Sequence, residues 1–143
     1  MFETPAAQFG ALLMGAVCLF SAWAGGRPQK VVAAIAAIGW IASAAAEDRS
    51  YLHPQYLTFA LDILLMVVFV ALALKWRRAW LYGLAAFQTL TTASHMAMIL
   101  DPRIWPKASI TAYLVWSYLV LACLLWGGVA GLLERRRPGD ARA

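Results

Sequence analysis

The chain has 143 residues, of which 63% are apolar and 13% are charged, and its formal net charge is +5. Soluble domains average roughly 45–50% apolar and about 25% charged residues, so this composition excludes an ordinary soluble domain and predicts an integral membrane protein. The apolar segments leave no room for a separate soluble catalytic domain. The positive charges flank those segments, so we do not expect nucleic acid as a partner.

Five apolar segments follow one another along the chain, at approximately residues 6–24, 31–46, 56–74, 79–100 and 108–133. Each is close to the ~17–25 residues that a bilayer-spanning helix needs. The sequence therefore predicts an all-α, polytopic membrane protein built as a compact bundle of five transmembrane helices. In this prediction residues 1–133 form a single transmembrane helical bundle, and residues 134–143 form a short basic cytoplasmic tail.

The first segment predicts a retained helix rather than a cleaved signal peptide. Glu3 occupies the place where a signal peptide carries basic residues, and the first basic pair, Arg27 and Lys30, follows the apolar run.

The second segment, residues 31–46, is short and dominated by alanine, with Gly39 near its middle. Small side chains allow neighbouring helices to approach closely, so we expect this helix in the interior of the bundle. Sixteen residues at ~1.5 Å per residue fall short of ~30 Å, which leaves an interfacial or re-entrant segment as the alternative to a full span.

The third and fourth segments each carry one ionisable residue well inside an apolar run, Asp62 and His95 respectively. A charged group at membrane depth is costly and normally faces a partner inside the bundle. Asp62 lies six residues from Tyr56, or ~9 Å, and His95 lies five residues from Leu100, or ~8 Å. Because a very short turn joins the two helices, they are expected to be antiparallel neighbours, and an Asp62–His95 contact is predicted.

The fifth segment, residues 108–133, contains a G-x-x-x-G pair formed by Gly127 and Gly131. Such a pair permits a close helix crossing, although the pattern is common. Gly127, Gly131 and Gly39 are our candidates for helix-packing faces.

Further polar side chains are expected in the layer of Asp62 and His95: Gln88, Thr92, Tyr113, Ser117 and Ser43. Three interpretations of this intramembrane cluster stay open: a polar contact that fixes helix register, a proton relay or ion sensor that uses the histidine, and a site for a ligand, lipid or quinone. No metal site and no cofactor are predicted. Haem and quinone are not excluded, although the second histidine, His53, lies in a loop.

The basic residues alternate between the gaps and so indicate a topology. Nine of the twelve lie in three regions: Arg27, Lys30, Lys75, Arg77, Arg78, Arg135, Arg136, Arg137 and Arg142. Cytoplasmic loops retain Lys and Arg near helix ends, so the N-terminus is expected outside and the C-terminus in the cytoplasm.

Phosphate loops, catalytic triads and paired acidic motifs are not recognisable in the sequence, so an enzyme is not the favoured reading. We expect a non-catalytic accessory, assembly or structural subunit of a larger membrane complex, with the lipid bilayer and other membrane subunits or further copies of itself as partners. The alternative is a small transporter or proton-linked channel component that uses the Asp62–His95 pair. An intramembrane ligand-, lipid- or cofactor-binding protein is the third reading, and the expected location is a bacterial inner (cytoplasmic) membrane, crossed several times.

Overall fold

A computed structural model of the chain describes residues 5–46, 56–101 and 106–136. These residues form five α-helices: α1 (Pro5–Ala24), α2 (Arg27–Ala46), α3 (Tyr56–Trp76), α4 (Ala79–Leu100) and α5 (Pro106–Arg135). The predicted all-helical architecture is confirmed, and each helix lies within a few residues of its expected bounds.

Three helices are long and apolar enough to cross a membrane within the described residues: α2, α3 and the Thr111–Arg135 part of α5. Such helices are typical of a membrane protein. The apolar part of α1, Gln8–Ala24, is shorter. In α4, Gln88, the threonines and His95 lower the mean hydropathy, and several of these polar side chains are buried against other helices.

The second helix differs from its prediction in two respects. It begins at Arg27 and has 20 residues, because only Gly25 and Gly26 interrupt the chain after α1. Pro28 is compatible with a first helical turn, where its missing N–H would have no intrahelical acceptor. At ~1.5 Å per residue the helix is about 30 Å long, so the short length that favoured an interfacial or re-entrant segment does not apply.

We expected α2 to be enclosed by protein, and this was wrong. Val32, Ala33 and Gly39 are buried on one side of the helix, whereas Ile38 and Ile41 are 67% and 58% exposed on the other. One face of α2 is packed, and the β-branched side chains of Ile38 and Ile41 on the opposite face point away from the bundle.

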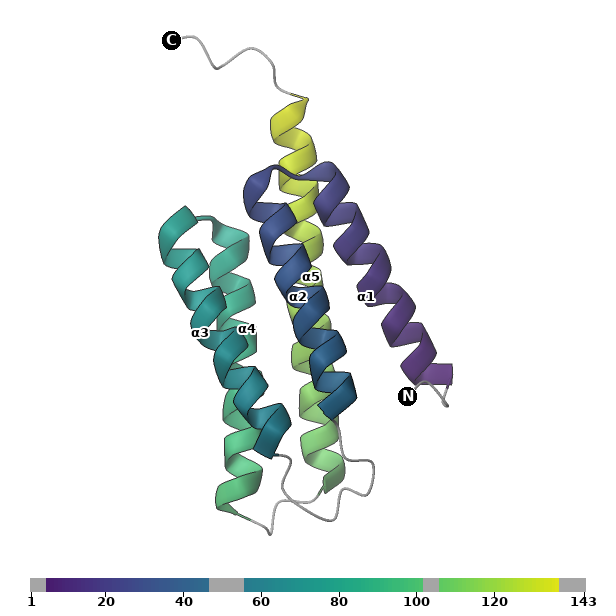
Figure 1. Ribbon diagram of the computed structural model, residues 1–143, viewed down its shortest axis with the longest axis vertical. Coiled ribbons are helices and arrows are strands. Elements are labelled where there is room, and N and C mark those ends of the chain that lie inside the picture. The colour runs from purple at the N-terminus through teal and green to yellow at the C-terminus, as the bar shows by residue number, and fades with distance from the viewer. Residues whose placement is uncertain (1–4, 47–55, 102–105, 137–143) are drawn as a thin grey trace.

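Two antiparallel hairpins, α1–α2 and α3–α4, pack with α5, which runs behind α2 in the view of Figure 1. α5 contacts α1, α2 and α4, while α3 contacts α2 and α4. Phe69, Leu81, Leu84 and Leu124 are among the largest side chains of the core.

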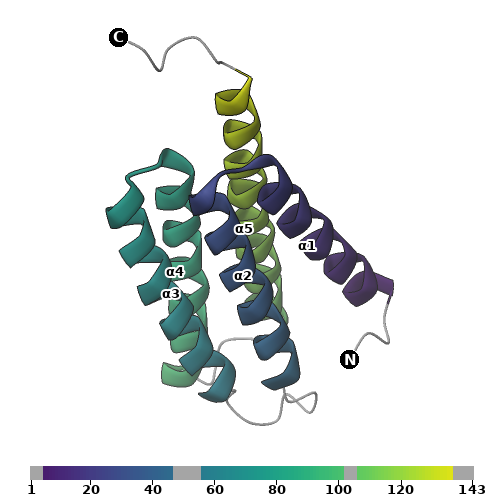
Figure 2. The ribbon, with the colours of Figure 1, turned by 45° about the horizontal axis from the view of Figure 1, so that its top comes forward.

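The α1–α2 turn, the α3–α4 turn and the C-terminal end of α5 lie at the same end of the bundle, the upper end in Figures 1 and 2. This end, called the basic end below, carries Arg27, Lys30, Lys75, Arg77, Arg78, Arg135 and Arg136. The fold thus brings together, at one end of the bundle, the basic segments that alternate in the sequence with segments poor in Lys and Arg.

The predicted glycine faces are packed by helices of the same chain. A Cβ atom added to Gly127 would lie 2.7 Å from Cδ2 of Trp80, and one added to Gly131 would lie 2.7 Å from Cα of Gly25. A Cβ atom added to Gly39 would come equally close to the Leu65 side chain. The structure therefore uses all three glycines for contacts inside the bundle, α4 with α5, α1 with α5 and α2 with α3.

Near the basic end, the α1–α2 hairpin is fastened to α5 by hydrogen bonds that the sequence did not suggest. Ser21 Oγ donates to the Leu124 carbonyl at 2.6 Å, and Gln29 Nε2 donates to the Gly127 carbonyl at 3.2 Å. The guanidinium of Arg135 donates to the carbonyls of Trp23 and Gly25 at 3.0 and 2.5 Å. These last two bonds satisfy acceptors that the end of α1 leaves without an intrahelical partner.

Candidate functional site

The carboxylate of Asp62 and the imidazole of His95 form a close pair between α3 and α4. Asp62 Oδ2 lies 2.5 Å from His95 Nδ1, and the two side chains are 9% and 15% exposed. The contact predicted from their equal depth is therefore present. The Asp62–His95 pair lies far from the α3–α4 turn, toward the end of the bundle opposite the basic end.

The short turn between α3 and α4 explains why the two residues meet. Asp62 lies 14 residues before Trp76, where α3 ends, and His95 lies 16 residues after Ala79, where α4 begins. At ~1.5 Å per residue these spacings are about 21 and 24 Å, so two antiparallel helices bring both residues to nearly the same level.

Gln88 and Thr92 complete the contact between α3 and α4 around Asp62. Gln88 Nε2 donates to Asp62 Oδ1 at 3.1 Å, so each carboxylate oxygen has a partner. Thr92 Oγ1 lies 3.2 Å from the Asp62 carbonyl and 3.0 Å from the Gln88 carbonyl. Gln88, Thr92 and His95 follow one another at i, i+4 and i+7, which places all three on one face of α4.

From α5, Tyr113 joins this cluster through its ring. The centroids of the Tyr113 and His95 rings are 4.1 Å apart, with an angle of 47° between the ring planes. The Tyr113 hydroxyl donates to Sδ of Met98 at 3.0 Å. The sequence indicated Tyr113 by its depth but gave no reason to single out Met98, which lies one turn after His95.

A second contact between α4 and α5 lies beside the cluster. Trp116 Nε1 donates to Ser94 Oγ at 3.2 Å, and the Trp116 ring stacks on Phe87 with a centroid distance of 6.4 Å and an angle of 15°. Trp116 follows Tyr113 by three residues, so both side chains lie on the face of α5 that contacts α4.

Two predicted members are not joined to the cluster. Ser117 is exposed and Ser43 is half-buried, and in the described part of the chain neither forms a hydrogen bond with Asp62, Gln88, Thr92, His95 or Tyr113. Their depth along α5 and α2 was the basis of the prediction, but depth does not determine which face of a helix a side chain occupies.

The contact between Asp62 Oδ2 and His95 Nδ1 couples the protonation of the two side chains. When Asp62 is ionised, its carboxylate only accepts hydrogen bonds, so the proton of a neutral His95 lies on Nδ1 and Nε2 is the acceptor. With a neutral imidazole, the pair carries one negative charge in apolar surroundings. A proton taken up at Nε2 makes the pair neutral overall, and His95 is the more exposed of the two side chains.

A polar route does not continue from the pair toward the basic end among the described residues of α3 and α4. The buried side chains there are apolar: Phe69, Ala73, Trp80, Leu81, Leu84 and Ala85. Trp80 has an indole N–H, but it lies against Gly127 and is 3% exposed.

In the described ranges, no group of three His, Cys, Asp or Glu side chains lies close enough to hold a metal ion.

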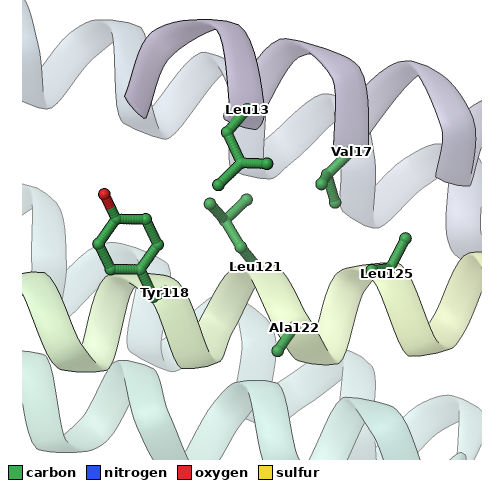
Figure 3. A pocket seen from close by; sticks show the side chains of 6 residues that line it. All are labelled: Leu13, Val17, Tyr118, Leu121, Ala122 and Leu125. Atoms are coloured by element: carbon green, nitrogen blue, oxygen red, sulfur yellow. The ribbon is translucent and has the colours of Figure 1, made fainter. Parts of the chain in front are cut away.

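An apolar groove of about 190 Å³ lies apart from the cluster, between α1 and α5. Leu13 and Val17 of α1 point toward Tyr118, Leu121 and Leu125 of α5 (Figure 3). Tyr113 and Trp116, the α5 aromatic residues beside the Asp62–His95 pair, do not line this groove.

Comparison with protein-family models, with characterised proteins and with solved structures found no match to this chain.

Proposed function

We propose that the protein is a non-catalytic component of a larger membrane assembly, and that its Asp62–His95 pair binds and releases a proton. The observation that carries the proposal is the 2.5 Å contact between Asp62 Oδ2 and His95 Nδ1, with Gln88 on the second carboxylate oxygen. Ionisable groups inside membrane proteins commonly mark proton or ion sites, and histidine changes charge near neutral pH.

In this proposal all five helices cross a bacterial inner membrane. The basic end is cytoplasmic, so the N-terminus lies outside and the proton reaches His95 from the outer side. The distribution of Lys and Arg between the two ends of the bundle supports this orientation. The two helix turns and the C-terminal end of α5 lie at the same end of the bundle, which supports the proposed odd number of crossings.

The apolar side chains between the pair and the basic end favour a component over a complete carrier. Phe69, Leu81 and Leu84 leave no polar path for a proton through α3 and α4. Proton binding at the pair would therefore alter how the helices pack or associate rather than carry a proton across. Gly39, Gly127 and Gly131 are occupied within the chain, so a partner subunit would contact the exposed apolar surface, to which Leu12 and Leu19 of α1 contribute.

The proton site is tested by nuclear magnetic resonance of the protein with ¹⁵N-labelled histidine. His53→Gln leaves His95 as the remaining histidine. We expect the neutral imidazole of His95 to be protonated at Nδ1 and the ¹⁵N shifts to report a second proton added at Nε2. In Asp62→Asn the preference for the Nδ1-protonated form should be lost, because an amide can donate as well as accept hydrogen bonds. Nitrogen shifts that do not change with pH, or a neutral form protonated at Nε2, would contradict the proposal.

A flux measurement tests the distinction between a component and a complete carrier. Proteoliposomes that contain a pH-sensitive dye and receive a pH step should show no protein-dependent proton flux from this chain alone. A flux that disappears in His95→Gln would instead identify a complete proton pathway. Crosslinking in native membranes should recover a partner or a second copy, and a chain recovered only as a monomer would contradict the assembly role.

A further inference from the structure

The turn between α3 and α4 contains a backbone conformation that its residue does not favour. Arg77 has φ of 50°, the only positive φ at a non-glycine residue in the described part of the chain. Its N–H donates to the Ala73 carbonyl at 2.8 Å, which closes the C-terminal turn of α3. Glycine or asparagine is usual at such a left-handed helix end, because a Cβ atom makes this conformation costly. An arginine in this conformation costs stability relative to glycine.

Membrane topology alone does not explain this placement. The orienting effect of basic residues depends on their number near a helix end and not on one backbone position. Lys75 and Arg78 already flank the turn, so a glycine at position 77 would leave the orientation signal in place. Backbone strain that a structure retains is commonly associated with a binding or functional site.

The charges of Lys75 and Arg77 are not neutralised by an acidic side chain in the described part of the chain. Glu134 is the one acidic residue described at the basic end, and Arg78 forms an ion pair with it. Lys75 and Arg77 are exposed, and no ion pair among the described residues includes them. Lys75 Nζ lies 6.0 Å from the centroid of the Trp76 ring, which is half-buried at the end of α3.

We propose that the segment Lys75–Arg78 is a binding site for the phosphate of an acidic phospholipid headgroup, with Lys75 and Arg77 as the ligating cations. Tryptophan is enriched at headgroup depth, so Trp76 would place both cations at the level of the phosphate. Arginine matches a phosphate with two parallel N–H donors, which accounts for an arginine at the strained position. The Arg78–Glu134 pair links the turn to the end of α5 and leaves Lys75 and Arg77 as the cations without an acidic partner among the described residues.

The test uses thermal unfolding of the full chain in neutral detergent, with phosphatidylglycerol or phosphatidylcholine added in mixed micelles. Arg77→Gly removes the charge and the strain together, so we expect a higher unfolding midpoint than wild type without lipid and a smaller increase with phosphatidylglycerol. Arg77→Gln removes the charge and retains the strain. In both variants the phosphatidylglycerol concentration for half-maximal stabilisation should rise about fivefold, the effect of one basic residue at an anionic surface.

Two control variants distinguish binding at a defined lipid site from nonspecific electrostatic attraction between the basic end and an anionic lipid. Arg77→Lys retains the charge without the two parallel N–H donors, so its lipid response should lie between those of wild type and Arg77→Gln. Arg136→Gln, which removes one charge from the same end, should weaken the response less than Arg77→Gln does. An Arg136→Gln effect as large as that of Arg77→Gln would overturn the proposal, as would an unchanged response in Arg77→Gln. Inorganic phosphate that stabilises as well as phosphatidylglycerol would show an anion site without lipid recognition and would also overturn it.

The lipid site does not rest on the proton site. Asp62→Asn is expected to keep the full phosphatidylglycerol response, and Arg77→Gln is expected to leave the ¹⁵N spectrum of His95 unchanged. Failure of one proposal is therefore distinguishable from failure of the other.

Discussion

Asp62 and His95, 33 positions apart in the sequence, approach to 2.5 Å and join α3 to α4 far from the turn that connects these helices. The Gln88 side chain occupies the other oxygen of the same carboxylate at 3.1 Å. Both acceptors of a buried carboxylate are thus satisfied by one neighbouring helix. The pair consequently contributes to the packing of α3 on α4 as well as to any exchange of protons.

The energetic coupling of this pair can be measured with a double-mutant cycle of Asp62→Asn and His95→Gln. Interhelical hydrogen bonds in membrane proteins contribute about 0.6 kcal/mol on average and reach about 1.7 kcal/mol. A short contact with a charged group should lie at the upper end, so we expect a coupling of about 1.5 kcal/mol in reversible unfolding in mixed micelles. A coupling near zero would show that the two side chains do not stabilise each other.

Removal of Gln88 should destabilise the protein through the carboxylate that it leaves unsatisfied. In Gln88→Leu, Asp62 Oδ1 loses its hydrogen bond in apolar surroundings, at an expected cost of about 1–3 kcal/mol. Thr89→Ala is the matched control, because Thr89 is exposed on the same helix and donates only to the Ala85 carbonyl. Equal stability of the two variants would contradict the assigned role of Gln88.

Gly127→Ala should destabilise the folded monomer, since the new methyl group would lie 2.7 Å from the Trp80 ring. Overpacking of this kind typically costs about 1–3 kcal/mol. Gly15→Ala is the control, because a Cβ atom at Gly15 meets nothing within 4 Å. Unfolding in mixed micelles and light scattering of the same samples separate the possibilities: unchanged monomer stability with lost association would show that Gly127 faces a partner rather than Trp80.

Arg135→Gln should loosen the junction of α1 and α2, because it removes the donors to the Trp23 and Gly25 carbonyls. We expect faster amide hydrogen exchange over the last turn of α1 and the first turn of α2, by roughly tenfold for a loss of about 1.4 kcal/mol. Arg136→Gln removes the same charge and leaves these hydrogen bonds intact. If both variants exchange alike, the charge and not the carbonyl contacts stabilises the junction.

The proposed orientation predicts which ends of the helices are reachable from outside. After Cys18→Ala and Cys123→Ala, a cysteine introduced at Asp101 should react with a membrane-impermeant maleimide on intact spheroplasts. One introduced at Arg136 should react only after lysis. The reverse pattern would place the basic end outside and the proton site on the cytoplasmic side.

The sequence was sufficient to predict the five helices, because apolar runs separated by polar residues and helix-breaking glycines and prolines are local features. It also predicted the Asp62–His95 contact. The turn at Arg77 and Arg78 is so short that it fixes the relative level of two antiparallel helices, and a count of residues then gives the depth of each side chain. Gln88 and Thr92 followed from helical spacing on the same face of α4.

The rotation of each helix about its axis, by contrast, was decided by the tertiary structure. Ser43 and Ser117 have a depth similar to that of Asp62 but do not join the cluster. The contacts of Gly39 with Leu65 and of Gly127 with Trp80 fix which faces of α2 and α5 pack inward. Because of these contacts, the glycine faces pack against other helices of the same chain. Hydropathy locates the ends of each helix, and a count of residues then gives the depth of a side chain. The fit of side-chain volumes between helices decides which side chains meet.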